Sequence, residues 1–309
     1  MNEHSIVVEG LRKNFQGVKA VDKISFKVRK GEFFGILGPN GAGKTTTIRM
    51  LTGVLKPDGG SVHIDGIDMR RDSLAAKRRM GVIPEVGTVY IDLTARDNLE
   101  LFGMYYGLSR ESRRARADQL LQDFGLHHRA DDPVKQFSKG MRQRISIGCA
   151  MVHDPSVLFL DEPTEGLDVQ SRRLILERVQ DMNAKGCTVI LTTHNIEEAS
   201  RLCDRVAIIN KGQLVTVDSP ESLKSTFEET RSVEVVFDQP VPCDDFDSSC
   251  VLKAEEHGDT MRLYTSDPDR TVQEVMRMRD ERGLKILSIC TLGPSLEDVF
   301  VRLTGEGRG

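Results

Sequence analysis

The sequence predicts an α/β protein built on a mostly parallel sheet and followed by a small α+β domain. Residues 33–37, 157–160 and 188–192 form short, mostly apolar runs, which are typical of strands buried on both faces of a parallel sheet. Helical patterns separate these runs, and an alternation of strand and helix indicates a parallel α/β sheet. After Ser219 and Pro220 the pattern changes, which indicates a second domain.

The first part of the chain is predicted to contain several short strands. Residues 6–8 and 24–28 are predicted to be strands, the second from its alternation of apolar and polar residues. Strand 33–37 leads through a glycine-rich loop into a helix at residues 45–51. Residues 61–64 follow a turn and are predicted to be a further strand.

A helical insert is predicted at about residues 88–155. Apolar positions recur at helical spacing in residues 98–106 and 113–124. Gly107 and Gly125 follow these two segments, and glycine is a common residue just after the end of a helix. The insert therefore interrupts the alternation of strands and helices.

The domain boundaries follow from these patterns. We assign residues 1–220 to the first domain and residues 230–309 to the second. Residues 231–309 carry 10 basic and 16 acidic side chains, a net charge of −6, which leaves +2 on the rest of the chain. The second domain is predicted to contain strands 232–237, 261–264 and 286–291 and helices 272–282 and 295–303, whereas helix 171–183 belongs to the first domain.

The composition is that of a soluble globular protein, with 39% hydrophobic and 29% charged residues. Trp is absent, aromatic residues reach only 5% and the net charge is −4, so we expect no nucleic-acid partner. No apolar run is long enough to cross a membrane and no signal segment is recognisable, which predicts a cytosolic protein. The six cysteines lack metal-site spacing and are expected to be reduced thiols.

A phosphate-binding loop is the first motif that carries chemistry. The pattern G-x-x-x-x-G-K-[ST] is matched by Gly38-Pro39-Asn40-Gly41-Ala42-Gly43-Lys44-Thr45. Its glycines allow backbone N–H groups to converge on phosphate oxygens at the positive end of the following helix. Lys44 is expected to reach the β- and γ-phosphates and the Thr45 hydroxyl to bind Mg²⁺. The sequence therefore predicts a nucleotide site between a buried strand and a helix.

Two carboxylates end the apolar strand at residues 157–160. Adjacent residues at a strand end point to different sides, so Asp161 and Glu162 can serve two tasks. We expect Asp161 to hold Mg²⁺ and Glu162 to polarise the attacking water. Such a pair is common on exposed strand ends, and its significance comes from the phosphate-binding loop.

Residues 137–144, Phe-Ser-Lys-Gly-Met-Arg-Gln-Arg, resemble the ABC signature, usually written L-S-G-G-Q. With this motif the chain resembles the ABC ATPases from Ile6 to about Pro220. The resemblance implies a P-loop NTPase (RecA-like) core with an antiparallel β subdomain and a helical insert. It also implies a head-to-tail homodimer, in which ATP held by one subunit is contacted by the other subunit's Ser138, Lys139, Gly140 and Met141.

The resemblance assigns further residues by position. Phe15 would stack on the adenine, His194 would contact the γ-phosphate and Asp168 would lie in the D-loop at the dimer interface. Glu85 occupies the place of a Gln that usually binds Mg²⁺, so it would add negative charge beside the triphosphate. The implied nucleotide-binding residues are Phe15 and Gly38, Pro39, Asn40, Gly41, Ala42, Gly43, Lys44, Thr45 and Thr46, and the implied catalytic residues are Glu162, His194 and Lys44.

The form of the signature and the C-terminal residues 294–300 resemble the ABC-2 type exporter branch. This implies an ATPase that energises export through a separate integral membrane permease, with ATP and Mg²⁺ as cofactors. It places the chain in the cytoplasm, on the inner face of the cell membrane. In that branch a small C-terminal domain helps subunits associate, and the same role is implied here.

Two other functions remain open from the sequence. One is a soluble ABC ATPase of DNA repair, chromosome organisation or translation, although no coiled coil, zinc-type Cys cluster or second cassette is present. The other is a regulatory nucleotide-binding module without turnover, which Glu85 favours and Glu162 and His194 oppose. The transported substrate is not predicted, because the membrane partner would contact it.

Overall fold

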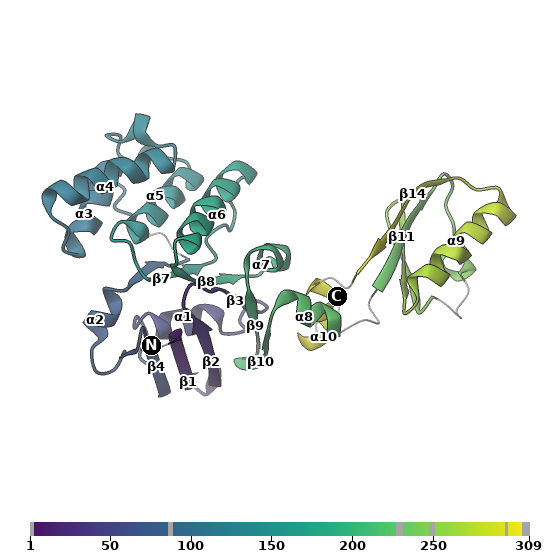
Figure 1. Ribbon diagram of the computed structural model, residues 1–309, viewed down its shortest axis with the longest axis horizontal. Helices are drawn as coiled ribbons and strands as arrows, with labels where there is room; N and C mark the ends of the chain where they lie inside the picture. Colours follow the sequence, from purple (N-terminus) through teal and green to yellow (C-terminus); the bar gives the residue numbers. More distant parts are fainter. Residues whose placement is uncertain (1–2, 86–88, 227–230, 247–250, 294–295, 305–309) are drawn as a thin grey trace. The chain divides into compact units, whose positions relative to one another are not determined.

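The chain folds as two compact units, Met1–Asp218 and Ser219–Gly309. The computed structural model describes residues 3–85, 89–226, 231–246, 251–293 and 296–304. Across these residues no helix combines the length and the apolar character that a membrane span requires. Figure 1 labels the helices and strands of both units.

A six-stranded sheet forms the centre of the first unit. Its strand order is β10-β9-β3-β8-β7-β6, and all neighbours run parallel except β10, which is antiparallel to β9. The strands are β3 (Phe33–Leu37), β6 (Met80–Ile83), β7 (Val157–Asp161), β8 (Thr188–Thr193), β9 (Arg205–Asn210) and β10 (Gln213–Asp218). Every residue of β3, β7 and β8 is buried, as the mostly apolar runs predict.

A second, antiparallel sheet has the order β2-β1-β4-β5. Its strands are β1 (His4–Phe15), β2 (Val18–Arg29), β4 (Gly59–Ile64) and β5 (Ile67–Asp68). The first two strands are much longer than the predicted segments 6–8 and 24–28. Their extra residues alternate between buried and exposed positions, so charged residues continue the ladder on its solvent side.

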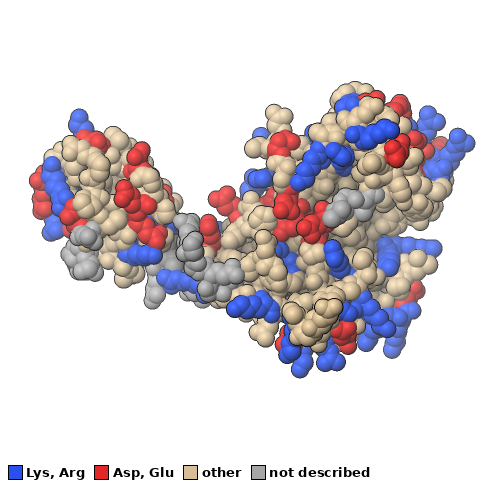
Figure 2. Space-filling view, turned by 180° about the vertical axis from the view of Figure 1, so that it is seen from behind, with Lys and Arg blue, Asp and Glu red and all other residues tan. Residues whose placement is uncertain are grey.

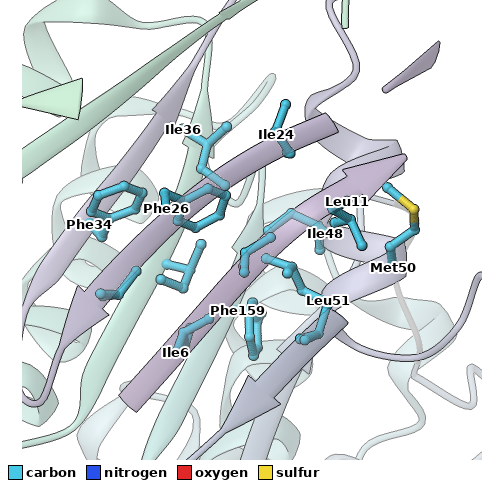
Figure 3. Close-up of a cluster of buried hydrophobic side chains, with 14 of the residues drawn as sticks. Ile6, Leu11, Ile24, Phe26, Phe34, Ile36, Ile48, Met50, Leu51 and Phe159 are labelled. Carbon is cyan, nitrogen blue, oxygen red and sulfur yellow. The ribbon is translucent and has the colours of Figure 1, made fainter. Parts of the chain in front are cut away.

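The main core lies between these two sheets and the helix α1 (Lys44–Leu51). Figure 3 shows apolar side chains from both sheets and from α1 pointing toward one another. The rings of Phe26 in β2 and Phe34 in β3 stack with centroids 5.4 Å apart. Burial of each such side chain contributes about 1.5–3 kcal/mol to the free energy of unfolding. This core fixes the position of the loop between β3 and α1.

Helices α3 (Ala95–Tyr105), α4 (Arg110–Asp123) and α5 (Lys139–Met151) form the predicted helical insert. Their N-caps are Thr94, Ser109 and Ser138, each of which accepts a hydrogen bond from a backbone N–H of the first turn. In Figure 1 these helices and α6 (Val169–Ala184) lie above the parallel sheet, and α1 and the antiparallel strands lie below it. Short helices are α2 (Ser73–Lys77) and α7 (Ile196–Leu202), and 3₁₀ turns span His127–Arg129 and Val134–Gln136.

Charges of both signs cover the helical layer. Figure 2 shows Lys and Arg side chains with Asp and Glu side chains between them on this part of the molecule. Arg96 of α3 pairs with Asp118 and Asp131, and Arg116 of α4 pairs with Asp154. The basic residues of α4 therefore belong to a mixed, solvated surface.

The second unit is a four-stranded antiparallel sheet with the order β12-β13-β11-β14, together with helices. Its elements are α8 (Pro220–Thr226), β11 (Arg231–Phe237), a 3₁₀ turn at Cys243–Asp245, β12 (Lys253–His257), β13 (Thr260–Thr265), α9 (Pro268–Arg282), β14 (Ile286–Leu292) and α10 (Leu296–Thr304). Val275 and Met278 of α9 pack with Val233, Val235 and Leu263 of the sheet in a separate core. The predicted fold class, α/β with a small α+β part, is confirmed.

Candidate active site

Four strand ends carry the predicted site residues to one edge of the parallel sheet. β3 and β8 are hydrogen-bonded neighbours, as are β8 and β7, and β7 and β6. The carboxyl ends of these strands lead to the phosphate-binding loop, His194, Glu162 and Glu85. Because parallel strands end at the same edge, residues more than a hundred positions apart in the sequence come together there.

The phosphate-binding loop depends on glycines at two positions. Gly43 precedes α1 with a φ of 106°, which L side chains rarely adopt, and a Cβ there would overlap the carbonyl oxygen of Ala20. A Cβ on Gly38 would overlap the carbonyl oxygen of Ile209. The buried Lys44 closes the loop on itself, because its Nζ donates hydrogen bonds to the carbonyl oxygens of Gly38 (2.7 Å) and Pro39 (3.2 Å).

A cavity of about 370 Å³ opens over this loop. Residues of the loop and of the start of α1 line it together with acidic and histidine side chains from the other strand ends. Its lining residues are Ala20, Pro39, Asn40, Gly41, Ala42, Gly43, Lys44, Thr45, Thr46, Glu85, Glu162, Glu165 and His194. The structure thus brings together most of the residues that the sequence predicts for nucleotide binding and catalysis.

Asp161 ends β7, directly before Glu162, and is only 2% exposed. Its Oδ1 accepts hydrogen bonds from the hydroxyls of Thr192 (2.6 Å) and Thr45 (3.2 Å). Among the residues that the structure describes, no Lys, Arg or His forms an ion pair with this carboxylate. A buried carboxylate without a cation, next to a hydroxyl, fits Mg²⁺, which prefers oxygen ligands and keeps waters and phosphates as its other ligands.

Glu162 stands between a lysine and a histidine. Its Oε1 is 3.7 Å from Lys44 Nζ, and its Oε2 is 3.0 Å from His194 Nδ1 and accepts a longer bond from the His194 backbone N–H. Burial raises the pKa of Glu162, and the charges of His194 and Lys44 oppose this shift. A carboxylate with a raised pKa and a defined orientation is suited to activate a water molecule at the cavity.

Glu85 and Phe15 lie at the margin of this arrangement. Glu85 is exposed and lines the cavity, so its charge faces the space over the loop. Phe15, at the end of β1, is 45% exposed and does not line the cavity, and Lys13 Nζ lies 5.5 Å from the centroid of its ring. An exposed ring at the end of a strand is available for stacking.

The signature residues lie at the start of α5 and do not line this cavity. The Ser138 hydroxyl caps α5 by accepting a hydrogen bond from Met141 N–H at 3.2 Å. Asp168 caps α6 in the same way, accepting from Ser171 N–H at 2.8 Å, and this bond lowers the pKa of its carboxyl. A Cβ on Gly140 would overlap Ser171 Oγ, so Gly140 is also required for contact between the two helix starts.

Sequence reasoning missed three residues that belong to this site. Thr192 holds Asp161, and the signal was available, because a polar residue in a buried apolar strand calls for a hydrogen-bond partner. Ala20 and Glu165 line the cavity. Ala20 comes from β2, whose approach to the loop no local pattern indicates, and Glu165 follows the Asp161-Glu162 strand end by three residues.

A glycine-rich loop between a buried strand and a helix, faced by an Asp-Glu strand end, defines a P-loop ATPase. Comparisons with known proteins narrow this class. The family model described as "ABC transporter" matches residues 21–165. The "Nod factor export ATP-binding protein I" of Ralstonia nicotianae is 40% identical over 97% of this chain and 93% of its own length. The protein of the same name from Rhizobium sp. is 38% identical over 99% of both chains.

Solved structures agree with this result. One, described as the ATP-binding subunit of an ABC transporter, has a TM-score of 0.67 and 32% identity and covers 72% of this chain and 92% of its own. Another, a dimeric ATP-binding cassette in a post-hydrolysis state bound to ADP and Pi, has a TM-score of 0.64 and 27% identity and covers 69% and 98% of the two chains. The chain therefore belongs to the ABC transporter family, as an ATP-binding subunit with ATPase activity.

Proposed function

We propose that this chain hydrolyses ATP to drive export through a separate membrane permease, and that it works as a head-to-tail dimer. The observation that carries the proposal is the position of Glu162, whose partly buried carboxylate lines the phosphate-binding cavity and contacts both Lys44 and His194. The relatives are named for export of Nod factor, and the permease would contact the cargo, so this chain's share is the supply of energy.

The residues divide the chemistry in the following way. Backbone N–H groups of residues 38–45 bind the triphosphate of ATP, Lys44 reaches its β- and γ-phosphates, and Phe15 stacks on the adenine. Thr45 and Asp161 would hold Mg²⁺, with Glu85 as a further oxygen ligand, and the ion would neutralise negative charge on the phosphates. Turnover distinguishes this chain from a regulatory module, since a module that only binds nucleotide needs no activated water.

Hydrolysis itself needs one proton acceptor and one oriented water. The water oxygen bonds to the γ-phosphorus as the bond from that phosphorus to the β,γ-bridging oxygen breaks, which yields ADP and Pi. Glu162 orients the water and accepts its proton, while Lys44 stabilises the charge that develops on the phosphate oxygens. His194 holds the carboxylate and contacts the γ-phosphate.

The test is Glu162→Gln. The variant should bind ATP, and its steady-state turnover should fall by about 10²–10⁴, because the amide cannot accept the proton. Glu177→Gln, on the exposed side of α6, is the matched control and should hydrolyse ATP at the normal rate. Normal turnover by Glu162→Gln would refute the assignment of the base.

The dimer is completed by the signature of the partner subunit, with Asp168 at the interface. ATP favours the closed pair because only that state makes both sets of γ-phosphate contacts. Ser138→Asp keeps the N-cap of α5 and adds a negative charge where the partner's phosphate would lie, so this variant should fold and be inactive. Ser138→Asn, an equally good cap without the charge, is its control.

Mixing two inactive variants gives a sharper result. A dimer of Ser138→Asp with Glu162→Gln has one site in which both the base and the opposite signature are intact. An equimolar mixture should recover roughly a quarter of the normal rate. Half of the dimers are mixed, and in each mixed dimer one of the two sites is intact. No recovery, with subunit exchange demonstrated by size or label, would exclude completion of the site in trans.

The second unit is assigned to subunit association, and the two edges of its sheet support this role. The edge strand β12 carries Lys253, Glu255 and Glu256, and charges of this kind protect an edge from pairing. The opposite edge strand, β14, has the sequence Ile-Leu-Ser-Ile-Cys-Thr-Leu without a charge, and its Leu287 is 66% exposed. A second copy is always present in the dimer, so β14 would pair with the same strand of that copy.

The exposed Cys290 of β14 provides the probe for this role. A bismaleimide should cross-link the full chain to a dimer without ATP, and Cys290→Ser should abolish the product. Leu287→Lys should weaken association measured by sedimentation, because like charges would face each other across the pair. If Leu287→Lys associates normally and Cys290→Ser gives the same yield of cross-linked dimer, β14 is not the strand through which the subunits associate.

The permease would hold the chain at the inner face of the cell membrane, in the cytoplasm where ATP is available. Purification of the chain from gently solubilised membranes should bring down an integral membrane protein. If no integral membrane protein co-purifies with the chain, the result would favour an ABC ATPase that does not serve transport. Identification of that protein would also reveal the cargo.

A further inference from the structure

Glu162 has a backbone conformation that a non-glycine residue rarely adopts, with a φ of 49°. Such a conformation persists only where the surrounding structure fixes it. On the side of β8, the backbone N–H of Glu162 donates hydrogen bonds to the carbonyl oxygen and the hydroxyl of Thr192, both at 3.1 Å. These bonds hold Glu162 itself, and other contacts must hold the residues that follow it.

A glutamine of α5 holds the next residue. Gln143 Nε2 donates a hydrogen bond of 3.0 Å to the carbonyl oxygen of the buried Pro163. Proline has no N–H, so this carbonyl is the only backbone hydrogen-bonding group that it offers. Gln143 lies in the same helix that Ser138 caps, so the bond joins the signature helix to the residue directly after Glu162.

A buried glutamate holds the following residue from another side. Glu198 of α7 is 5% exposed, and its carboxylate accepts hydrogen bonds from Thr164 Oγ1 at 3.1 and 3.2 Å and from Thr193 Oγ1 at 3.3 Å. Thr164 is two residues after Glu162 and Thr193 directly precedes His194. One carboxylate therefore connects the two segments that carry the proposed base and its histidine.

The helix α7 does not need this carboxylate for itself. An acid at the third helical position commonly reaches back to the N–H of the N-cap residue. Here the N-cap N–H of Asn195 donates instead to Thr193 Oγ1, at 2.9 Å, and the Asn195 side chain accepts from Glu198 N–H. Within the described part of the chain Glu198 has no ion pair, so its burial is compensated by the two threonine hydroxyls.

We propose that Gln143 and Glu198 are positioning residues that clamp Pro163 and Thr164 from two sides and thereby set the direction of the Glu162 carboxylate. Neither side chain lines the cavity, so neither touches the nucleotide. The inference rests on the proposed role of Glu162 as the base. A carboxylate that is free to turn away from His194 orients water less often, and the loss appears in the chemical step and not in binding.

The position of Gln143 adds a consequence for the dimer. Its helix begins with the signature that, in the proposed dimer, contacts the ATP of the partner subunit. Any movement of α5 on that contact reaches Pro163 through one hydrogen bond, and so reaches the base of the subunit's own site. Loss of this bond should reduce the cooperativity of hydrolysis with respect to ATP as well as its rate.

The experiment compares near-isosteric variants with neighbours that face solvent. Glu198→Gln replaces an acceptor oxygen by a donor amide, and Gln143→Leu removes the donor. Each should lower kcat at least tenfold while the dissociation constant of a fluorescent ATP analogue changes less than twofold. The controls are Glu197→Gln on α7 and Gln122→Leu on α4, both exposed, and they should retain the normal kcat.

A second comparison separates positioning from a general structural role. Thr164→Val should reproduce the effect of Glu198→Gln, and the double variant should be no slower than either single one, since they break the same link. In a Glu162→Gln background, Glu198→Gln should cause no further loss. Parallel losses of kcat, ATP affinity and thermal stability in Glu198→Gln would overturn the inference, as would a normal kcat in both Glu198→Gln and Gln143→Leu.

The role of the base and the role of the clamp can be tested separately. If Glu162→Gln keeps its activity, the proposed base is wrong and the clamp has nothing to position. If Glu162→Gln is inactive but Glu198→Gln and Gln143→Leu turn over normally, the base stands and the clamp is wrong. Glu198→Asp keeps a carboxylate, whereas Glu198→Ala removes it. A higher kcat in Glu198→Asp than in Glu198→Ala, with the same ATP affinity in both variants, would support the clamp.

Discussion

His153 is a buried ionisable group that should make the first unit sensitive to acid. Its ring stacks on Tyr106 with centroids 3.4 Å apart and planes inclined by 4°. Nε2 lies 3.1 Å from the carbonyl oxygen of Met80, which can only accept, so Nε2 carries the proton. Nδ1 is buried and has no hydrogen-bond partner among the described residues. The site is therefore built for the neutral ring.

Burial lowers the pKa of His153 from 6.5 to about 4. The unfolded chain thus takes up a proton at His153 at a higher pH than the folded chain, and the free energy of unfolding decreases as the pH falls from about 6.5 to about 4. Each unit of pKa difference corresponds to about 1.4 kcal/mol, so the full loss is about 3 kcal/mol. Above pH 7 the ring is neutral in both states and contributes no pH dependence.

The measurement is urea unfolding followed by circular dichroism at pH 8 and pH 5. Between these values the normal chain should lose about 2 kcal/mol more than His153→Gln, which cannot be protonated. His128→Gln, at an exposed position, is the control and should follow the normal chain. Equal losses in the normal chain and in His153→Gln would refute the reasoning, as would an NMR titration of His153 with a midpoint near 6.5.

Three other perturbations test the site and the core. Glu85→Gln removes a negative charge that faces the cavity and should raise the ATPase rate about three- to tenfold, whereas an unchanged rate would show that this charge does not oppose ATP. Gly38→Ala places a methyl group on the carbonyl oxygen of Ile209 and should weaken ATP binding at least tenfold in a nucleotide titration, a prediction that normal binding would contradict. Phe159→Ala should lower the free energy of unfolding by about 3–5 kcal/mol in denaturant unfolding. The control Val54→Ala, at an exposed position, should lower it by less than about 0.5 kcal/mol, and similar losses in both variants would contradict the assigned core.

The sequence predicted the parts of the fold that local patterns determine. Apolar runs such as 157–160 are buried on both faces in the structure, because parallel strands covered by layers on each side exclude polar residues. β12 was missed, since its Lys-Ala-Glu-Glu-His sequence suits an exposed edge and has little of the composition of a strand. Helix α9 begins at Pro268, four residues before the predicted start, because Asp267 caps it and proline is favoured in the first turn.

The site was predictable where chemistry requires a fixed residue type at a fixed spacing. Lys44, Asp161 and Glu162 met this condition, whereas the strand order that brings them together was not predicted. A polar residue such as Thr192 in a buried strand signals the need for a partner, but the sequence does not indicate which residue that partner is, because each supporting contact joins distant segments. Thr192 of β8 reaches Asp161 of the neighbouring strand β7 across 31 residues. Glu198 of α7 reaches Thr164 across 34 residues, an approach that no local pattern specifies.

The signature residues show why a motif alone does not reveal whether its residues are required for folding or for function. Gly140 is tightly packed against Ser171 within one chain, and Ser138 caps its own helix, so both residues have sufficient reasons to be present before any partner is considered. A substitution that disturbs these contacts would reduce activity whether or not the signature ever meets a second nucleotide. Ser138→Asp preserves the cap and alters the outward charge. Only a change of this kind separates the structural role of the residue from contact with the partner's nucleotide. The same logic applies to Glu198, where burial alone would predict a structural role and the partners of its carboxylate point to the base.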